Sequence, residues 1–130
     1  MGSFCTVINC MDGRMQLPVI AFLQKRFHAE YVDSITAPGP NLILAKGEDL
    51  NAVDGILRCV EISVGKHGST GIAIVGHEDC AGNPADKGEQ FLHLRLAYDR
   101  IHDAFPDCEI TTLWVSIKGY VEEIPFGQQS

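Results

Sequence analysis

Short apolar runs alternate with amphipathic segments along the chain, and this alternation constrains the fold more than any other feature. The runs typical of buried strands lie at residues 4–9, 31–36, 71–76 and 109–117. Helical segments, with apolar side chains three and four positions apart, lie between them at residues 18–28, 49–67 and 84–104. Such an alternation predicts an α/β fold: a three-layer sandwich with helices on both faces of a central, mostly parallel sheet.

The order of the strands in this sheet decides which loops meet. Ligands bind beyond the carboxyl ends of parallel strands, where the strand order reverses. Counted along the chain, the order 2-1-3-4 would make the first and third strands neighbours. Residues 120–124 are a candidate for a fifth, antiparallel edge strand, and residues 41–45 favour a short turn or helical piece.

Prolines, glycines and capping residues indicate where the helices begin and end. Pro18 suits the first position of the first helix, and Asn83 with Pro84 would begin the third. Gly68 can adopt the left-handed conformation that ends the second helix. The loop at residues 37–40, Ala-Pro-Gly-Pro, can continue neither a helix nor a strand.

The size and charge of the chain exclude several classes of protein. A length of 130 residues indicates one domain over residues 1–130. The formal net charge of -7 argues against binding to nucleic acid or to anionic membrane surfaces. No apolar run approaches the ~18 residues of a membrane span, and no secretory leader precedes the first strand pattern. We therefore expect a cytoplasmic protein.

The chain has five cysteines, and an odd number without a leader fits reduced thiols better than a disulfide framework. Three of them fall within or beside apolar patterns, and we expect small core residues at Cys5, Cys59 and Cys108. The other two, Cys10 and Cys80, follow predicted strands and are candidates for chemistry.

An imidazole and a thiol lie three residues apart directly after the third strand pattern, at His77 and Cys80. Cys10 directly follows the first strand pattern. If these strands are neighbours, two thiolates and one imidazole converge on one point. Zinc binds both kinds of ligand, and three protein ligands leave one coordination position for water. We therefore predict that Cys10, His77 and Cys80 bind Zn2+.

A carboxylate and a guanidinium lie two residues apart beside the first of these thiols, at Asp12 and Arg14. Zinc lowers the pKa of bound water from about 15.7 to roughly 7, so hydroxide forms near neutral pH. Asp12 could orient this hydroxide, with Arg14 keeping the carboxylate ionised and aimed. Asp12 could instead become a fourth zinc ligand and expel the water. The spacing permits both states, and breaking the Asp12–Arg14 pair would be the switch between them.

Each of these residues also has a common structural role. A cysteine after a strand is often a core or loop thiol, Asp-Gly is a frequent turn, and His77 alone could be a hydrogen-bonded loop residue. A redox pair formed by the two thiols is the main competing use, but it would leave His77 and the Asp12–Arg14 pair without a role. The interval between Cys10 and Arg14 is also too short for the phosphate-binding loop of low-molecular-weight phosphatases.

The two segments together resemble the β-class carbonic anhydrases. Residues 10–14 are similar to the family's Cys-x-Asp-x-Arg motif, and residues 77–82 to its His-x-x-Cys-Gly segment. Each half is weak evidence, but the joint motif is specific, and the strand–helix order extends the resemblance over nearly the whole chain. The resemblance implies zinc held by the two thiols and the imidazole, with Asp12 and Arg14 as the catalytic dyad. It also implies a homodimer or higher homo-oligomer with sites near the subunit interface, and hydration of carbon dioxide (CO2) to bicarbonate.

The chain departs from the family pattern outside the proposed ligands and dyad. It is short and has no long N-terminal helical arm, and Met1 stands where many members have a glutamine. Residues 37–41 read Ala-Pro-Gly-Pro-Asn where many members have Arg-Asn-Ala-Gly-Asn. Ala81 replaces the first glycine after the second cysteine. The chain therefore looks most like a small, divergent branch of the family.

Three functions follow as hypotheses. The first is reversible hydration of CO2 to bicarbonate by a zinc-bound hydroxide. The second is hydrolysis of a related small electrophile, carbonyl sulfide (COS) or carbon disulfide (CS2), at the same site. The third is a non-catalytic zinc-binding module with Asp12 fixed on the metal. Four histidines are candidate proton shuttles by chemistry alone, although we expect each on a helix surface: His28, His67, His93 and His102.

Overall fold

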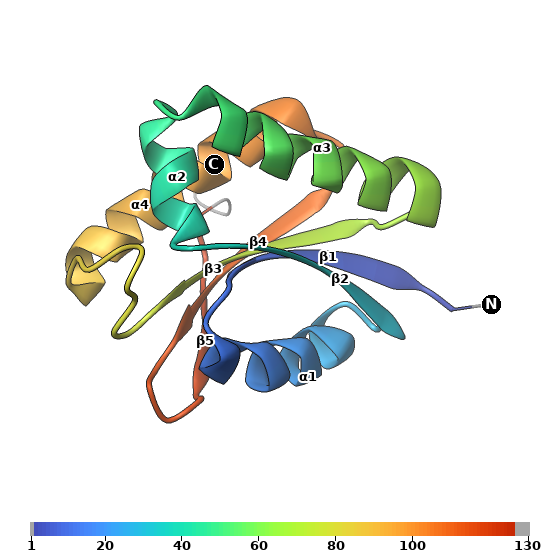
Figure 1. The fold of residues 1–130 in the computed structure, drawn as a ribbon. Coiled ribbons are helices and arrows are strands. Elements are labelled where there is room, and N and C mark those ends of the chain that lie inside the picture. Colours follow the sequence, from blue (N-terminus) through green and yellow to red (C-terminus); the bar gives the residue numbers. More distant parts are fainter. Residues whose placement is uncertain (1, 127–130) are drawn as a thin grey trace.

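A computed structural model describes residues 2–126 as a five-stranded sheet with helices on both faces (Figure 1). The strands are β1 (Phe4–Cys10), β2 (Tyr31–Ala37), β3 (Gly71–His77), β4 (Glu109–Val115) and β5 (Val121–Ile124). The helices are the 3-10 turn η1 (Gly13–Met15), α1 (Gln16–Arg26), α2 (Pro40–Lys46), α3 (Leu50–His67) and α4 (Lys87–Ala104). Within this described part of the chain, no helix combines the length and apolarity needed to cross a bilayer.

The sheet has the strand order β2-β1-β3-β4-β5, which confirms the predicted topology. The first four strands are parallel, and β5 pairs antiparallel with β4. In the register between β1 and β3, Ile8 lies opposite Ile74. Cys10 and His77 are the last residues of these two strands, and they therefore lie close together at the carboxyl edge of the sheet.

The sheet is buried on both faces, which explains the nearly continuous apolar patterns of its central strands. Figure 1 shows α1 on one face and α2, α3 and α4 on the other. Alternate residues of a strand point to opposite faces. Ile8 and Ile74 accordingly pack in the core under α2, α3 and α4, whereas Val7 and Val75 pack in the core with α1.

Most predicted helix ends agree with the structure. Gly68 ends α3 in the left-handed conformation, with a φ of 72°. Residues 41–45 lie in the short helix α2. Pro18 lies in the first turn of α1 but not at its first position, because the preceding turn η1 lets the helix begin at Gln16.

The predicted start of the third long helix is wrong. The helix begins at Lys87, and the carboxylate of Asp86 accepts a hydrogen bond from the backbone N–H of Glu89 (2.9 Å). Asn83 cannot serve as this cap because its side chain is buried, and its Nδ2 donates to His93 Nδ1 (2.9 Å). A capping residue with the right chemistry was therefore present at residue 83, but tertiary hydrogen bonds engage it.

The prediction that three cysteines are core residues holds fully for one of them. Cys5 is completely buried, and burial raises the pKa of its thiol to about 11. Cys108 is partly buried, whereas Cys59 is exposed. Cys59 was wrongly predicted because it lies just off the buried stripe of α3, beside Val60.

Candidate metal centre

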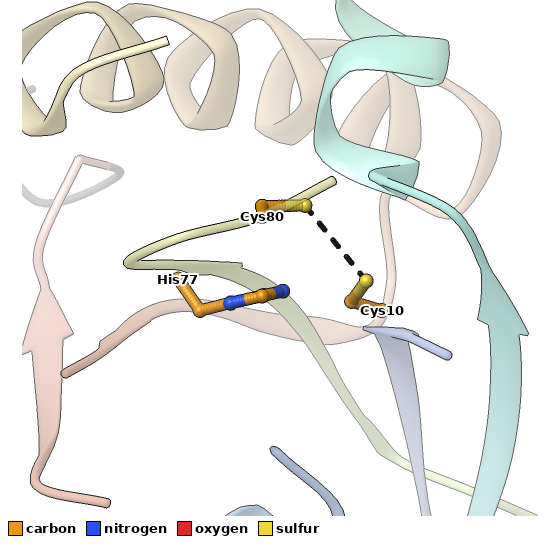
Figure 2. Close-up of side chains that lie close together, drawn as sticks. All are labelled: Cys10, His77 and Cys80. Atoms are coloured by element: carbon orange, nitrogen blue, oxygen red, sulfur yellow. Dashed lines mark hydrogen bonds between the residues drawn. The ribbon is translucent and has the colours of Figure 1, made fainter. Parts of the chain in front are cut away.

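Cys10, His77 and Cys80 lie together at the carboxyl edge of the sheet. Their ligand atoms are all within 4.8 Å of one another, and the Cys10 and Cys80 sulfurs are 3.8 Å apart. Figure 2 shows the two sulfurs facing each other, with the tip of the His77 ring directed toward them. The three residues are at most 5% exposed. The fold thus brings together the three side chains that the sequence singled out.

The hydrogen bonding of His77 leaves one ring nitrogen free to bind a metal ion. Nδ1 lies 2.8 Å from the carbonyl oxygen of Glu78, and because a carbonyl only accepts, Nδ1 carries the proton. Nε2 then has a lone pair, yet it is buried and has no hydrogen-bond partner. Leaving a buried polar atom unsatisfied costs roughly 1–3 kcal/mol. A metal ion bound between Nε2 and the two sulfurs would remove this cost, so the donor set fits a metal such as zinc.

The turn after β3 brings Cys80 back toward Cys10. Asp79 adopts the left-handed conformation, with a φ of 59°, which is uncommon for a residue other than glycine. Arg14 Nη2 donates to the carbonyl oxygen of Asp79 (3.2 Å), and Nη1 to its Oδ2 (3.3 Å). Arg14 therefore links the loop after β1 to the loop after β3.

Asp12 and Arg14 form a two-pronged ion pair beside the thiols. Arg14 Nη2 lies 2.6 Å from Asp12 Oδ2, and Arg14 Nε lies 3.0 Å from Oδ1. The backbone N–H of Arg14 also donates to Oδ1 (2.9 Å). Both carboxylate oxygens are thereby engaged by one neighbour, and the guanidinium reaches Asp79 as well.

The ion pair holds the pKa of Asp12 at about 2, below its ordinary value of 3.8, mainly through the hydrogen bonds from Arg14. Because the folded-state pKa is depressed, the pair stabilises the fold above about pH 4, and this contribution is lost as the pH falls through 2. We expect a carbon-13 NMR titration of the Asp12 carboxyl to give a midpoint near 2. In an Arg14→Gln variant the midpoint should return toward 3.8, and an unchanged midpoint would contradict this explanation.

Burial raises the pKa of the Cys80 thiol, and the neighbouring Cys10 sulfur raises it further. Thiols must lose their protons to bind a metal, so binding at this site releases protons. Affinity for the metal should therefore weaken as the pH is lowered.

Two polar residues that the sequence did not single out hold the loop after β1. Asn9 Oδ1 accepts from the backbone N–H of Cys10 (2.8 Å), and its Nδ2 donates to the Met15 carbonyl (3.0 Å). Gln16 Nε2 donates to the carbonyl oxygens of Cys10 (2.8 Å) and Asp12 (3.0 Å). Asn9 could have been noticed as an amide within an apolar strand pattern, but nothing local marked Gln16.

Gly39 and Gly82 bring the loops after β2 and β3 into backbone contact. A Cβ at Gly82 would overlap the main chain of Pro38 and lie 2.6 Å from Gly39 N. A Cβ at Gly39 would lie 2.7 Å from the carbonyl carbon of Gly82, and the φ of Gly39 is 61°. This contact explains why a glycine is needed at position 82, whereas Ala81 is exposed and tolerates a side chain.

We expect Gly82→Ala to lower the free energy of unfolding by about 1–3 kcal/mol, because the backbone atoms that it would meet cannot move aside freely. Gly55→Ala is the matched control, since a Cβ at Gly55 in α3 meets nothing within 4 Å. Replacing a glycine inside a helix should raise stability by roughly 0.5–1 kcal/mol. Urea titrations of both variants measure the two changes, and a neutral Gly82→Ala would contradict the close contact.

The four histidines considered as proton carriers lie outside the three-residue cluster that the described residues form. His67 Nδ1 lies 2.6 Å from Asp33 Oδ2, and the ring of His102 stacks on Tyr98. His93 accepts from Asn83, and His28 follows α1 with a φ of 51°. We assign none of them a role in proton transfer.

The fold and the cluster define an α/β protein with a candidate thiolate–imidazole metal centre at the carboxyl edge of its parallel sheet. A family model described as "Putative carbonic anhydrase" matches residues 1–125. The chain therefore belongs to this carbonic anhydrase family.

Two solved structures show the same fold. A carbonic anhydrase from Streptococcus mutans is 19% identical, with a TM-score of 0.64, covering 92% of this chain and 81% of that one. The β-carbonic anhydrase CcaA is 12% identical, with a TM-score of 0.58, covering 96% of this chain and 81% of that one. No curated protein sequence matches the chain significantly.

Proposed function

We propose that this protein is a zinc-dependent carbonic anhydrase that catalyses the reversible hydration of CO2 to bicarbonate. The observation that carries the proposal is the buried Nε2 of His77, which has no hydrogen-bond partner although the imidazole ring lies in a cluster with two thiols. A histidine that serves only the fold would normally satisfy both ring nitrogens. Membership of the carbonic anhydrase family supports the choice of reaction.

In this proposal the sulfurs of Cys10 and Cys80 and Nε2 of His77 would hold Zn2+, and these three protein ligands would leave a coordination position for water. Bound zinc would act as a Lewis acid that lowers the pKa of a water molecule into the neutral range. The proton that His77 Nδ1 donates to the Glu78 carbonyl keeps the ring oriented toward the two sulfurs.

Asp12 and Arg14 would be the catalytic dyad. The ionised Asp12 carboxylate can accept a hydrogen bond from the reacting water and so direct a lone pair of its oxygen toward CO2. Arg14 keeps Asp12 ionised and directed, through the two-pronged pair. Because both carboxylate oxygens bond to Arg14, this pairing favours the open state over one in which Asp12 is a fourth ligand.

Stopped-flow CO2 hydration by the zinc-loaded protein at pH 8.5 tests the proposal. We expect the zinc-loaded protein to hydrate CO2 much faster than buffer alone, and the zinc-free protein to be no faster than buffer. A rate equal to that of buffer would reject CO2 hydration. Sulfide release from COS or CS2 would then point to hydrolysis of those substrates, and four protein ligands on the metal at high pH, Asp12 among them, would indicate a non-catalytic module.

We also propose that the protein is a homodimer or higher homo-oligomer that takes only small molecules as substrates and acts in the cytoplasm. Exposed apolar side chains in the loops after β1 and β4, Met11 and Tyr120, support an interface between copies of the chain. Light scattering coupled to size-exclusion chromatography should give a mass of at least two chains.

A further inference from the structure

Gln90 contacts the main chain on both sides of the turn that carries Cys80, although the proposed chemistry does not use it. It lies near the start of α4, and its side chain is only 1% exposed. Its Nε2 donates to the carbonyl oxygens of His77 (3.0 Å), Asn83 (3.1 Å) and Ala85 (3.2 Å). The Gln90 carboxamide therefore bonds to the backbone before and after the turn that carries Cys80, which we call the ligand loop.

A second buried amide fixes the orientation of this carboxamide. One side-chain atom of Asn41 faces two donors, the backbone N–H of Leu42 (3.0 Å) and Asn83 Nδ2 (3.3 Å). Because it accepts both hydrogen bonds, this atom must be the amide oxygen, Oδ1. Asn41 Nδ2 then donates to Gln90 Oε1 (3.2 Å). With its oxygen engaged on this side, Gln90 directs its NH2 group toward the three carbonyls.

The strand residue before His77 allows the amides to approach this closely. A Cβ at Gly76 would lie 2.9 Å from Asn41 Nδ2 and 3.1 Å from Gln90 Oε1. Side chains of ordinary size at this position would force the amides away from the end of β3. The glycine and the two amides therefore form one arrangement directly behind the imidazole ligand.

We propose that Gln90 is a positioning residue of the metal centre, an inference that rests on the proposed function. By holding the His77 carbonyl, it fixes the peptide between His77 and Glu78. The next carbonyl, that of Glu78, accepts from Nδ1 of the imidazole and orients the ring. Arg14 holds the same loop from the other side, at Asp79. Gln90 and Arg14 together keep the His77 and Cys80 ligand atoms directed at Cys10 before a metal arrives.

The test compares metal binding by the full-length protein and its Gln90→Met variant, in which a side chain of similar length cannot donate. We expect zinc affinity, measured by competition with a chromogenic chelator, to fall about 10- to 100-fold, as for other residues that orient metal ligands. The visible absorption of the Co2+-loaded variant should also shift, since that spectrum reports ligand geometry.

Ser63→Ala is the matched control for a general loss of stability. Ser63 is buried, and its hydroxyl donates to Asp33 Oδ2 (2.6 Å) toward the amino ends of the strands, away from the ligand loop. This variant should be destabilised but should keep the parent zinc affinity and Co2+ spectrum. A spectrum and affinity that change equally in both variants would overturn the positioning role.

Asn41→Ala tests the same role without altering Gln90, and decides the matter if Gln90→Met does not fold. It removes the group that orients the carboxamide, so we expect a smaller loss of zinc affinity and a smaller spectral shift. Parent-like zinc affinity and spectrum in a folded variant would overturn the inference alone. Failure of the unsubstituted protein to bind either metal would instead overturn the proposed function, and the inference with it.

Discussion

Cys80→Ser is expected to lower zinc affinity by about 100- to 1,000-fold and to abolish CO2 hydration at ordinary zinc concentrations. Structural zinc sites bind with roughly 10–16 kcal/mol shared among four ligands, so each ligand accounts for about 2.5–4 kcal/mol. Serine is close in shape to cysteine but is a poor zinc ligand. The variant therefore loses one of the two buried sulfurs that face each other at the centre.

The control for this variant is Cys59→Ser, which makes the same chemical change at an exposed thiol on α3. Elemental analysis after dialysis should find one zinc per chain in the control and in the parent, and much less in Cys80→Ser. Equal zinc content in the two variants would show that the metal is not bound through Cys80.

Asp12→Asn is expected to lower kcat/KM for CO2 hydration by about 10²- to 10⁴-fold while zinc content stays the same, because a positioned carboxylate contributes rate enhancements of this size. Asparagine has the same shape, but its NH2 group cannot accept from Arg14. The variant therefore loses both the charge and the two-pronged pair that aims the side chain. Stopped-flow rates on zinc-loaded protein measure the loss.

A matched change at an exposed aspartate of α3, Asp54→Asn, should leave both rate and zinc content unaltered. If Asp12→Asn kept the parent rate, Asp12 would have no part in the reaction, and the dyad would have to be abandoned. If it lost zinc as well as rate, Asp12 would be acting as a metal ligand.

The strands and helices could be predicted because each carries its own sequence pattern. The strand order was predicted from the two candidate ligand segments, which meet only if the first and third strands are neighbours. The first and third strands become neighbours in the order 2-1-3-4, which places Cys10 beside His77 at one edge. Convergence of the three ligand side chains follows from this topology and from the three-residue spacing of His77 and Cys80. The sequence could not show the tautomer of His77, because the Glu78 carbonyl that sets it takes its place only in the folded turn.

Asn83 and Gln90 were missed for one cause, which is that tertiary hydrogen bonds engage side chains whose local sequence indicates another role. Asn83 has the chemistry of a helix cap, yet His93 and Asn41 engage its side chain, and α4 begins four residues later at Lys87. The role of Gln90 could not be predicted from the sequence for the same reason. A glutamine in a helix normally faces solvent, and only its burial against three carbonyls shows that it holds the loop that carries Cys80.

Zinc K-edge X-ray absorption on the zinc-loaded protein tests the central claim most directly, because it counts and identifies the atoms bound to the metal. We predict two sulfurs at about 2.3 Å, one imidazole nitrogen at about 2.0–2.1 Å and one further oxygen or nitrogen. A first shell without sulfur would contradict the account, because it would mean that Cys10 and Cys80 do not hold the metal.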